Sequence, residues 1–131
     1  MNLLLKKTLQ MKKALVVDDA EANRIVIGAI VEKFGLAVDY AEDGDEAVHK
    51  FASLTPDIVF IDQIMPRKNG SDAIKQMKLI TPNFTAILMS ALTNTEDIKK
   101  IVDSCGADEF LPKPISQTVI ADVLKKYHII E

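Results

Sequence analysis

Four polar signals in this sequence each follow a run of apolar residues: Asp18-Asp19, Asp62, Ser90 and Lys113. Carboxylate oxygens suit a hard divalent cation, and an ionised aspartate can also attack phosphorus to give an aspartyl phosphate. Phosphoryl transfer needs in-line positioning and neutralisation of anionic oxygens, for which a metal, a lysine and a hydroxyl are recurring parts. If folding brings these residues together, they can hold a cation and accept a phosphoryl group.

The apolar pattern predicts the elements that must position these side chains. Segments predicted to be strands from their apolar and β-branched residues lie at 14–17, 36–41, 57–61 and 84–89, and a short strand is predicted at 108–111. Between and after them, apolar residues three and four apart predict helices near 27–34, 43–53, 71–80, 95–105 and 115–127. Strict alternation of strands and helices implies right-handed crossovers, so we expect an α/β domain with a doubly wound parallel sheet covered on both faces.

Ligands of such sheets bind outside the carboxyl ends of the strands, which is where the polar signals fall. Asp18-Asp19 ends the first strand, Asp62 the third and Ser90 the fourth, and Lys113 follows the fifth. Three carboxylates at one rim repel each other unless a cation lies among them or one takes up a proton. The oxygen-rich set favours Mg²⁺. Asp62 stands alone at a central strand end, so we expect it to be the nucleophile and to be exposed at the rim.

Each of these signals also has an ordinary explanation when taken by itself. Asp18-Asp19 can be a helix N-cap with a solvated neighbour, and Ser90 a turn hydroxyl. Lys113-Pro114 can be a plain connection between a strand and a helix. Their joint occurrence, in order and at the ends of separate strands, favours the common site.

Composition limits the other functions open to the chain. Its 131 residues are the size of one domain, and 16 basic against 19 acidic side chains give a net charge of -3. That balance offers no bulk attraction for nucleic acid or an anionic membrane, and no apolar stretch approaches the length of a membrane span. The single cysteine, Cys105, has helix-core spacing and favours a reducing, cytoplasmic location. We expect residues 1–11 to be an N-terminal extension and 12–131 to be the domain.

The chain resembles a receiver domain of two-component response regulators, of the stand-alone type, from about Lys12 to Tyr127. The resemblance rests on four pieces in order: "LVVDD" at 15–19, "DQIMPRKNG" at 62–70, "MSA" at 89–91 and "LPKP" at 111–114. It implies a flavodoxin-like sheet with strand order 2-1-3-4-5 and five helices. It also implies that Asp62 accepts a phosphoryl group from a phosphohistidine of a sensor histidine kinase or a histidine phosphotransfer protein. Such a chain is not an enzyme in the ordinary sense.

The resemblance assigns roles to named residues. Mg²⁺ would be bound by Asp18, Asp19, Asp62 and the backbone carbonyl of Ile64. The phosphoryl group would contact Ser90, the backbone amide of Ala91, and Lys113, and the Lys113-Pro114 bond would be cis.

The resemblance also implies a response to phosphorylation. Inward movement of Ser90 would be coupled to the rotamer of Phe110, remodelling the face of the fourth helix, fifth strand and fifth helix. That face would bind a partner protein or form a phosphorylation-dependent homodimer; Phe110 can equally be a plain core residue. Ile64 and Leu92 are apolar where polar groups would orient a hydrolytic water, which predicts a long-lived aspartyl phosphate.

Two other classes of function could use a similar set of residues. A Mg²⁺-dependent phosphatase usually carries an acid two residues after the nucleophile, where this chain has Ile64. A receiver-like scaffold that binds partners without phosphorylation remains the alternative. We expect output through another protein, not direct binding of nucleic acid. Asn23 and Arg24 resemble the residues at this position in receivers attached to hybrid kinases, or they lie on a solvated helix face. His128 is expected to lie in a frayed terminus and to have no role.

Overall fold

The computed structural model describes residues 2–3 and 11–131, so most of the expected extension at 1–11 lies outside the described residues. Five parallel strands form one sheet in the order β2-β1-β3-β4-β5, which confirms the expected fold class and strand order. The strands are β1 Lys13–Val17, β2 Ala37–Ala41, β3 Ile58–Asp62, β4 Thr85–Ser90 and β5 Glu109–Pro112. The helices that follow them are α2 Glu21–Lys33, α3 Gly44–Leu54, α4 Gly70–Ile80, α5 Thr95–Cys105 and α6 Gln117–Lys126.

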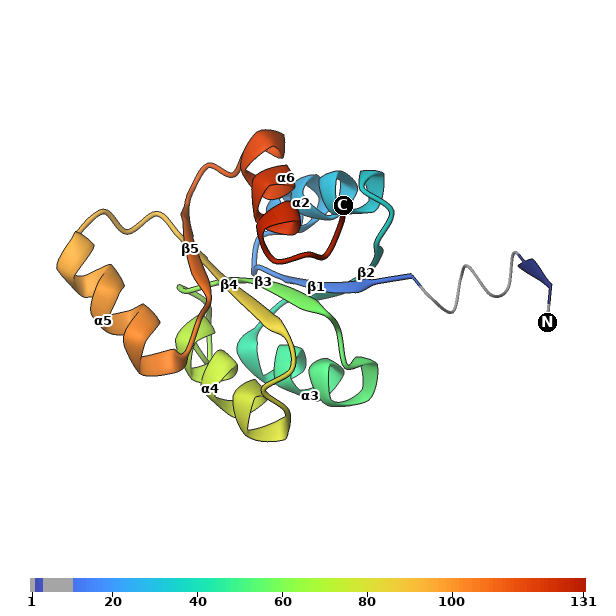
Figure 1. Ribbon diagram of the computed structural model, residues 1–131. Coiled ribbons are helices and arrows are strands. Elements are labelled where there is room, and N and C mark those ends of the chain that lie inside the picture. The colour runs from blue at the N-terminus through green and yellow to red at the C-terminus, as the bar shows by residue number, and fades with distance from the viewer. Residues whose placement is uncertain (1, 4–10) are drawn as a thin grey trace.

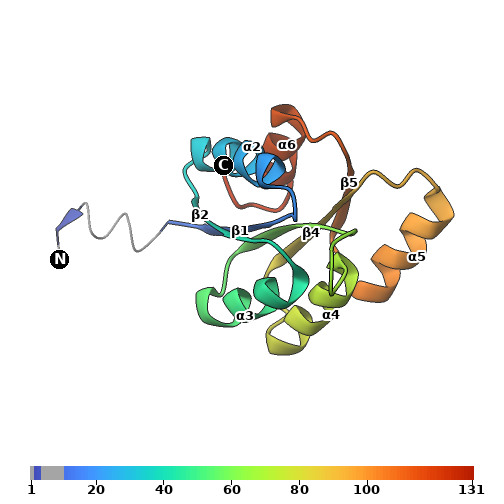
Figure 2. The ribbon, with the colours of Figure 1, turned by 180° about the vertical axis from the view of Figure 1, so that it is seen from behind.

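The sheet lies between two layers of helices (Figure 1). Helices α2 and α6 cover one face, and α3 and α4 cover the other. Helix α5 stands to the side of β5, beyond the edge of the sheet, as the opposite view also shows (Figure 2). The crossovers therefore build the doubly wound arrangement that the alternation predicts.

Alternate residues of each strand feed two separate cores. In β3, Val59 and Ile61 face α3 and α4, whereas Ile58 and Phe60 face α2 and α6. All five residues of this central strand are buried, as expected for a strand covered on both faces. The strand ends are therefore fixed firmly, and so are the side chains they carry.

The structure corrects two details of the expected helices. Ile80 is the last residue of the apolar pattern that predicts the helix at 71–80, and the pattern predicts it to be buried. It is 48% exposed, because the helix ends there and its buried stripe stops at Met77. The terminus around His128 was expected to fray; instead the amides of Ile129 and Ile130 donate to the Leu124 carbonyl, at 2.9 and 3.2 Å, and both side chains pack against the core. Cys105 is buried, as its spacing predicts.

Candidate functional site

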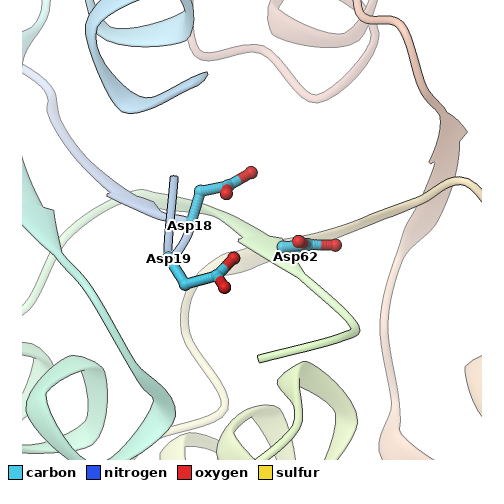
Figure 3. Close-up of side chains that lie close together, drawn as sticks. All are labelled: Asp18, Asp19 and Asp62. Atoms are coloured by element: carbon cyan, nitrogen blue, oxygen red, sulfur yellow. The ribbon is translucent and has the colours of Figure 1, made fainter. Parts of the chain in front are cut away.

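The pairing of β1 with β3 brings the three aspartates together. Val17 lies opposite Ile61, so Asp18 and Asp62 follow at the same edge of the sheet. Figure 3 shows the Asp18 and Asp19 carboxylates, from the end of β1, beside that of Asp62 at the end of β3. One carboxylate oxygen of each residue lies within 4.8 Å of the others. The expected acidic cluster is therefore formed.

Lys113 bridges two of these carboxylates. Its Nζ lies 2.7 Å from Asp18 Oδ2 and 3.1 Å from Asp62 Oδ2. Burial lowers the pKa of Lys113, but hydrogen bonds to Asp18 and Asp62 outweigh that effect, and its pKa ends above the usual value. The lysine therefore stays charged, and it partly neutralises the two acids that it touches.

Asp62 is less accessible than the sequence suggested. The residue is only 7% exposed, because it ends a strand buried on both faces and its carboxylate lies against Lys113 and Asp18. Burial raises the pKa of Asp62, Lys113 opposes this, and the charge of Asp18 adds to the rise. The expectation of an acid freely exposed at the rim is wrong. The carboxylate is instead a desolvated group that gains from a nearby cation.

Asp18 and Asp19 differ sharply although they are adjacent. Asp18 is fully buried, and its Oδ1 accepts a hydrogen bond of 2.9 Å from the Ala20 amide. The Asn23 amide nitrogen lies 3.4 and 3.3 Å from its two oxygens, and Arg24 Nη1 donates to its carbonyl at 2.7 Å. Asp19 is exposed. Asn23 and Arg24 therefore support the acidic cluster and are not a solvated helix face.

Ser90 and Lys113 are linked through the sheet. Ser90 lies opposite Pro112, and the Lys113 amide donates to the Ser90 carbonyl at 2.9 Å. Ser90 is fully buried, and its Oγ accepts from the Leu92 amide at 3.1 Å. Ala91, which follows it, is exposed at the rim. The Lys113–Pro114 peptide bond is cis, as the resemblance implies.

The loop after Asp62 folds back on the strand end. The Ile64 amide lies 3.4 Å from Asp62 Oδ1, and Ile64 as a whole is 62% exposed. A Cβ added to Gly70 would lie 2.4 Å from the Asp62 carbonyl oxygen, so only glycine permits this close return into α4.

Gln63 is a structural residue that the sequence interpretation missed. Its buried side chain accepts from the Ser71 amide at 2.8 Å and donates to Ser71 Oγ at 3.0 Å. The residue next to Asp62 is thereby tied to the first turn of α4. A glutamine directly after an apolar strand gave a weak signal, since such a position is also a common loop position.

Phe110 lies half-buried on β5, opposite Leu88, and packs against the core on the α3–α4 side. It also lines a groove of about 700 Å³ between α5 and β5, together with Leu92, Ile98 and Val102. The Ser90 hydroxyl thus contacts the backbone of Leu92, and Leu92 lines the same groove as Phe110.

The residues present fit a hard divalent cation. The clustered donor atoms are all carboxylate oxygens, without sulfur or imidazole, and two of the three acids are buried. Such a donor set suits Mg²⁺ or a similar ion with retained waters. Among the described residues, no helix is long and apolar enough to cross a membrane.

Comparisons with known proteins agree with this geometry. A family model described as the response regulator receiver domain matches residues 14–125. The chain is 38% identical over 116 residues to the chemotaxis protein CheY of Thermotoga maritima, covering 88% of this chain and 96% of that protein. The structure of Vibrio cholerae chemotaxis protein CheY4 superposes with a TM-score of 0.83 at 25% identity, covering 89% and 98% of the two chains. The response regulator domain of Thermotoga maritima CheB superposes with a TM-score of 0.78 at 33% identity, covering 91% of this chain and 95% of that chain.

Proposed function

The chain belongs to the response regulator receiver domain family, and from that premise we propose that Asp62 accepts a phosphoryl group from a phosphohistidine of a kinase or phosphotransfer protein. Domains of this family act in two-component signalling and are generally signalling domains rather than catalysts. The observation that carries the proposal is the position of Asp62, buried at the end of β3 with Lys113 bridging its carboxylate to that of Asp18.

The proposed chemistry is a simple transfer. An Asp62 carboxylate oxygen forms a bond to phosphorus, the phosphorus–nitrogen bond of the phosphohistidine breaks, and the imidazole nitrogen keeps the electron pair. Lys113 already touches Asp62 at 3.1 Å, so its ammonium can pair with a phosphoryl oxygen on that carboxylate. The Ser90 hydroxyl and the Ala91 amide, at the end of the neighbouring strand, are the further donors in this proposal.

The metal in this proposal is Mg²⁺. Asp18, Asp19, Asp62 and the carbonyl of Ile64 would hold it, and it would supply positive charge beside the anionic oxygens of the transferred group. The raised pKa of Asp62, which burial causes, makes an added cation more valuable for keeping this carboxylate ionised.

The output surface in this proposal is the face of α5, β5 and α6. A phosphoryl group adds charge and acceptor oxygens within reach of Ser90 and Lys113. Any movement of the Ser90 hydroxyl changes its hydrogen bond with the Leu92 amide, and Leu92 lines the groove that Phe110 also lines. This face would then bind a protein partner or a second copy of the chain. A cytoplasmic location, where such partners act, is part of the proposal.

Incubation with acetyl phosphate and Mg²⁺, followed by intact-mass measurement, tests the proposed function. We expect one phosphoryl adduct on the wild type, and none after addition of chelator. Asp62→Asn should give no adduct, whereas Asp57→Asn, directly before the start of the same strand, should behave as wild type. Borohydride reduction of the adduct and peptide mapping should place the modified residue at 62. No adduct on a folded wild type would favour the scaffold.

A further inference from the structure

The backbone and the carboxylate of Asp18 are held by different contacts. Only the backbone contacts are independent of Lys113, which also contacts Asp62. Its backbone is fixed, because its amide donates to the Ala41 carbonyl at 3.3 Å and its own carbonyl accepts from Arg24 at 2.7 Å. The remaining freedom is rotation of the carboxylate. Because this group is fully buried, its direction depends on the few donors that contact it.

The two carboxylate oxygens have different partners. Oδ1 accepts from the Ala20 amide at 2.9 Å and lies 3.4 Å from Asn23 Nδ2. Oδ2 accepts from Lys113 Nζ at 2.7 Å and lies 3.3 Å from the same Asn23 nitrogen. Asn23 is thus the one side-chain donor, among the described residues, that contacts both oxygens.

Lys113 contacts both Asp18 and Asp62. If it moves toward Asp62, Asp18 loses its closest hydrogen-bond donor. A phosphoryl group on Asp62 carries more charge than the carboxylate and draws the ammonium toward itself. Lys113 Nζ already lies 3.1 Å from Asp62 Oδ2, so a short turn of the lysine side chain is enough to take the ammonium from Asp18 to a phosphoryl group on Asp62. Once it turns, Asp18 Oδ2 retains Asn23 as its side-chain donor.

We propose that Asn23 is a positioning residue, which keeps the Asp18 carboxylate turned toward the metal site when Lys113 moves to the phosphoryl group on Asp62. An amide suits this purpose because it donates without positive charge, so it does not compete with a cation for the carboxylate. Its contacts of 3.3 and 3.4 Å are long while Lys113 holds Asp18, and they can shorten when Lys113 leaves. The inference rests on the proposed Mg²⁺-dependent acceptor.

A double-mutant cycle on Mg²⁺ binding tests this proposal without any phosphoryl transfer. Lys113→Met imitates departure of the ammonium, and Asn23→Leu removes the amide at similar size. The Mg²⁺ dissociation constant is measured by calorimetry for the wild type, both single variants and the double variant. Asn23→Leu should weaken Mg²⁺ binding about 2-fold in the wild type and about 10-fold in Lys113→Met, as expected for a charged hydrogen bond that contributes more once the lysine is gone.

Two further variants separate positioning from folding. Asn83→Leu changes an exposed asparagine at the opposite end of the sheet and should leave Mg²⁺ binding unchanged in both backgrounds. Asn23→Ala removes the donor without added bulk and should reproduce the pattern of Asn23→Leu. If Asn23→Leu weakens Mg²⁺ binding by the same factor in the wild type and in Lys113→Met, or weakens it in neither, the positioning role is overturned. The proposed function would remain intact. A folded wild type that binds no Mg²⁺ would remove the metal site and this inference together.

Discussion

Helices α4 and α5 have the same length and contribute to the same hydrophobic cluster, yet they are held very differently. Helix α4 buries a continuous stripe against the core, made by Gly70, Ser71, Ala73, Ile74 and Met77. Helix α5 buries Cys105 alone and stands beyond β5, with a groove between them (Figure 1). Local stability rises with the number of buried apolar contacts, so moving α5 should require less free energy than moving α4.

The two helices also begin differently relative to the acidic site. Helix α4 starts against Asp62 itself, through the contact at Gly70 and the pair of hydrogen bonds between Gln63 and Ser71. Helix α5 starts after the exposed loop that follows Ser90, capped by its own Asn94 side chain. Helix α4 therefore fixes the geometry of Asp62, the proposed acceptor, whereas α5 has fewer contacts that hold it in place.

An isoleucine-to-alanine substitution in each helix should give the largest difference in the free energy of unfolding. Ile74→Ala in α4 empties a fully buried position and should lower the free energy of unfolding by about 3 kcal/mol. Ile98→Ala in α5 alters a half-buried position lining the groove and should cost about 1 kcal/mol. Urea unfolding monitored by circular dichroism measures both. Equal losses would contradict the contrast between the helices.

Substitution of a glycine at one end of each helix should also affect stability and phosphoryl adduct formation differently. In Gly70→Ala the new Cβ meets the Asp62 carbonyl oxygen, so we expect a loss of about 2 kcal/mol and slower phosphoryl adduct formation. In Gly106→Ala, at the left-handed C-cap of α5, backbone strain should cost about 1 kcal/mol. Adduct formation should then be unchanged. A normal rate in Gly70→Ala would show that the start of α4 does not position Asp62.

The loops leading into the two helices carry the apolar residues expected to prolong the phosphorylated state. Ile64, before α4, is exposed beside Asp62, so Ile64→Asn places an amide where it can orient water. We expect hydrolysis of the adduct to be about 5-fold faster, equivalent to about 1 kcal/mol of barrier. Decay of the intact-mass adduct measures this. Ile64→Leu is the control, and an unchanged lifetime in Ile64→Asn would refute the explanation.

A small effect that depends on pH is expected at β5, the wall of the groove opposite α5. The Tyr127 hydroxyl donates to Glu109, and this bond lowers the pKa of Glu109, whereas burial and then Glu109 raise the pKa of Tyr127 to about 12. Stability from Glu109 is therefore lost as pH falls through its lowered pKa, and stability from Tyr127 is lost as pH rises toward 12. Tyr127→Phe should cost about 1 kcal/mol near neutral pH and less at pH 3. A cost that is constant with pH would contradict this origin.

The fold was largely predictable from the sequence because its strands are short, apolar and buried on both faces. The run at 57–61 was placed one residue early, since Asp62 is itself the last residue of β3. Ile80 and the terminal isoleucines were misjudged because apolar character does not reveal where a helix ends or a chain turns back. These outcomes depend on neighbouring elements, not on local pattern.

The aspartates and Lys113 were predictable because parallel strands bring their ends to one edge. The burial of Asp62 was not, since it depends on Lys113, which is distant in sequence. Asn23 and Arg24 were ambiguous for a similar reason: their spacing from Asp18 fits either a solvated helix face or contact with the strand end. Only the packing of α2 decides between them.

Hydrogen exchange of α4 and α5 during phosphorylation tests the central claim most directly, that Asp62 is modified at a rigid rim and the change is expressed at α5. Exchange is followed by mass spectrometry with acetyl phosphate and Mg²⁺ present or absent. We expect protection to change in peptides covering 95–105 and to stay constant in those covering 70–80, with neither changing in Asp62→Asn. Unchanged exchange at 95–105 in a fully phosphorylated protein, or the same change in Asp62→Asn, would contradict the claim.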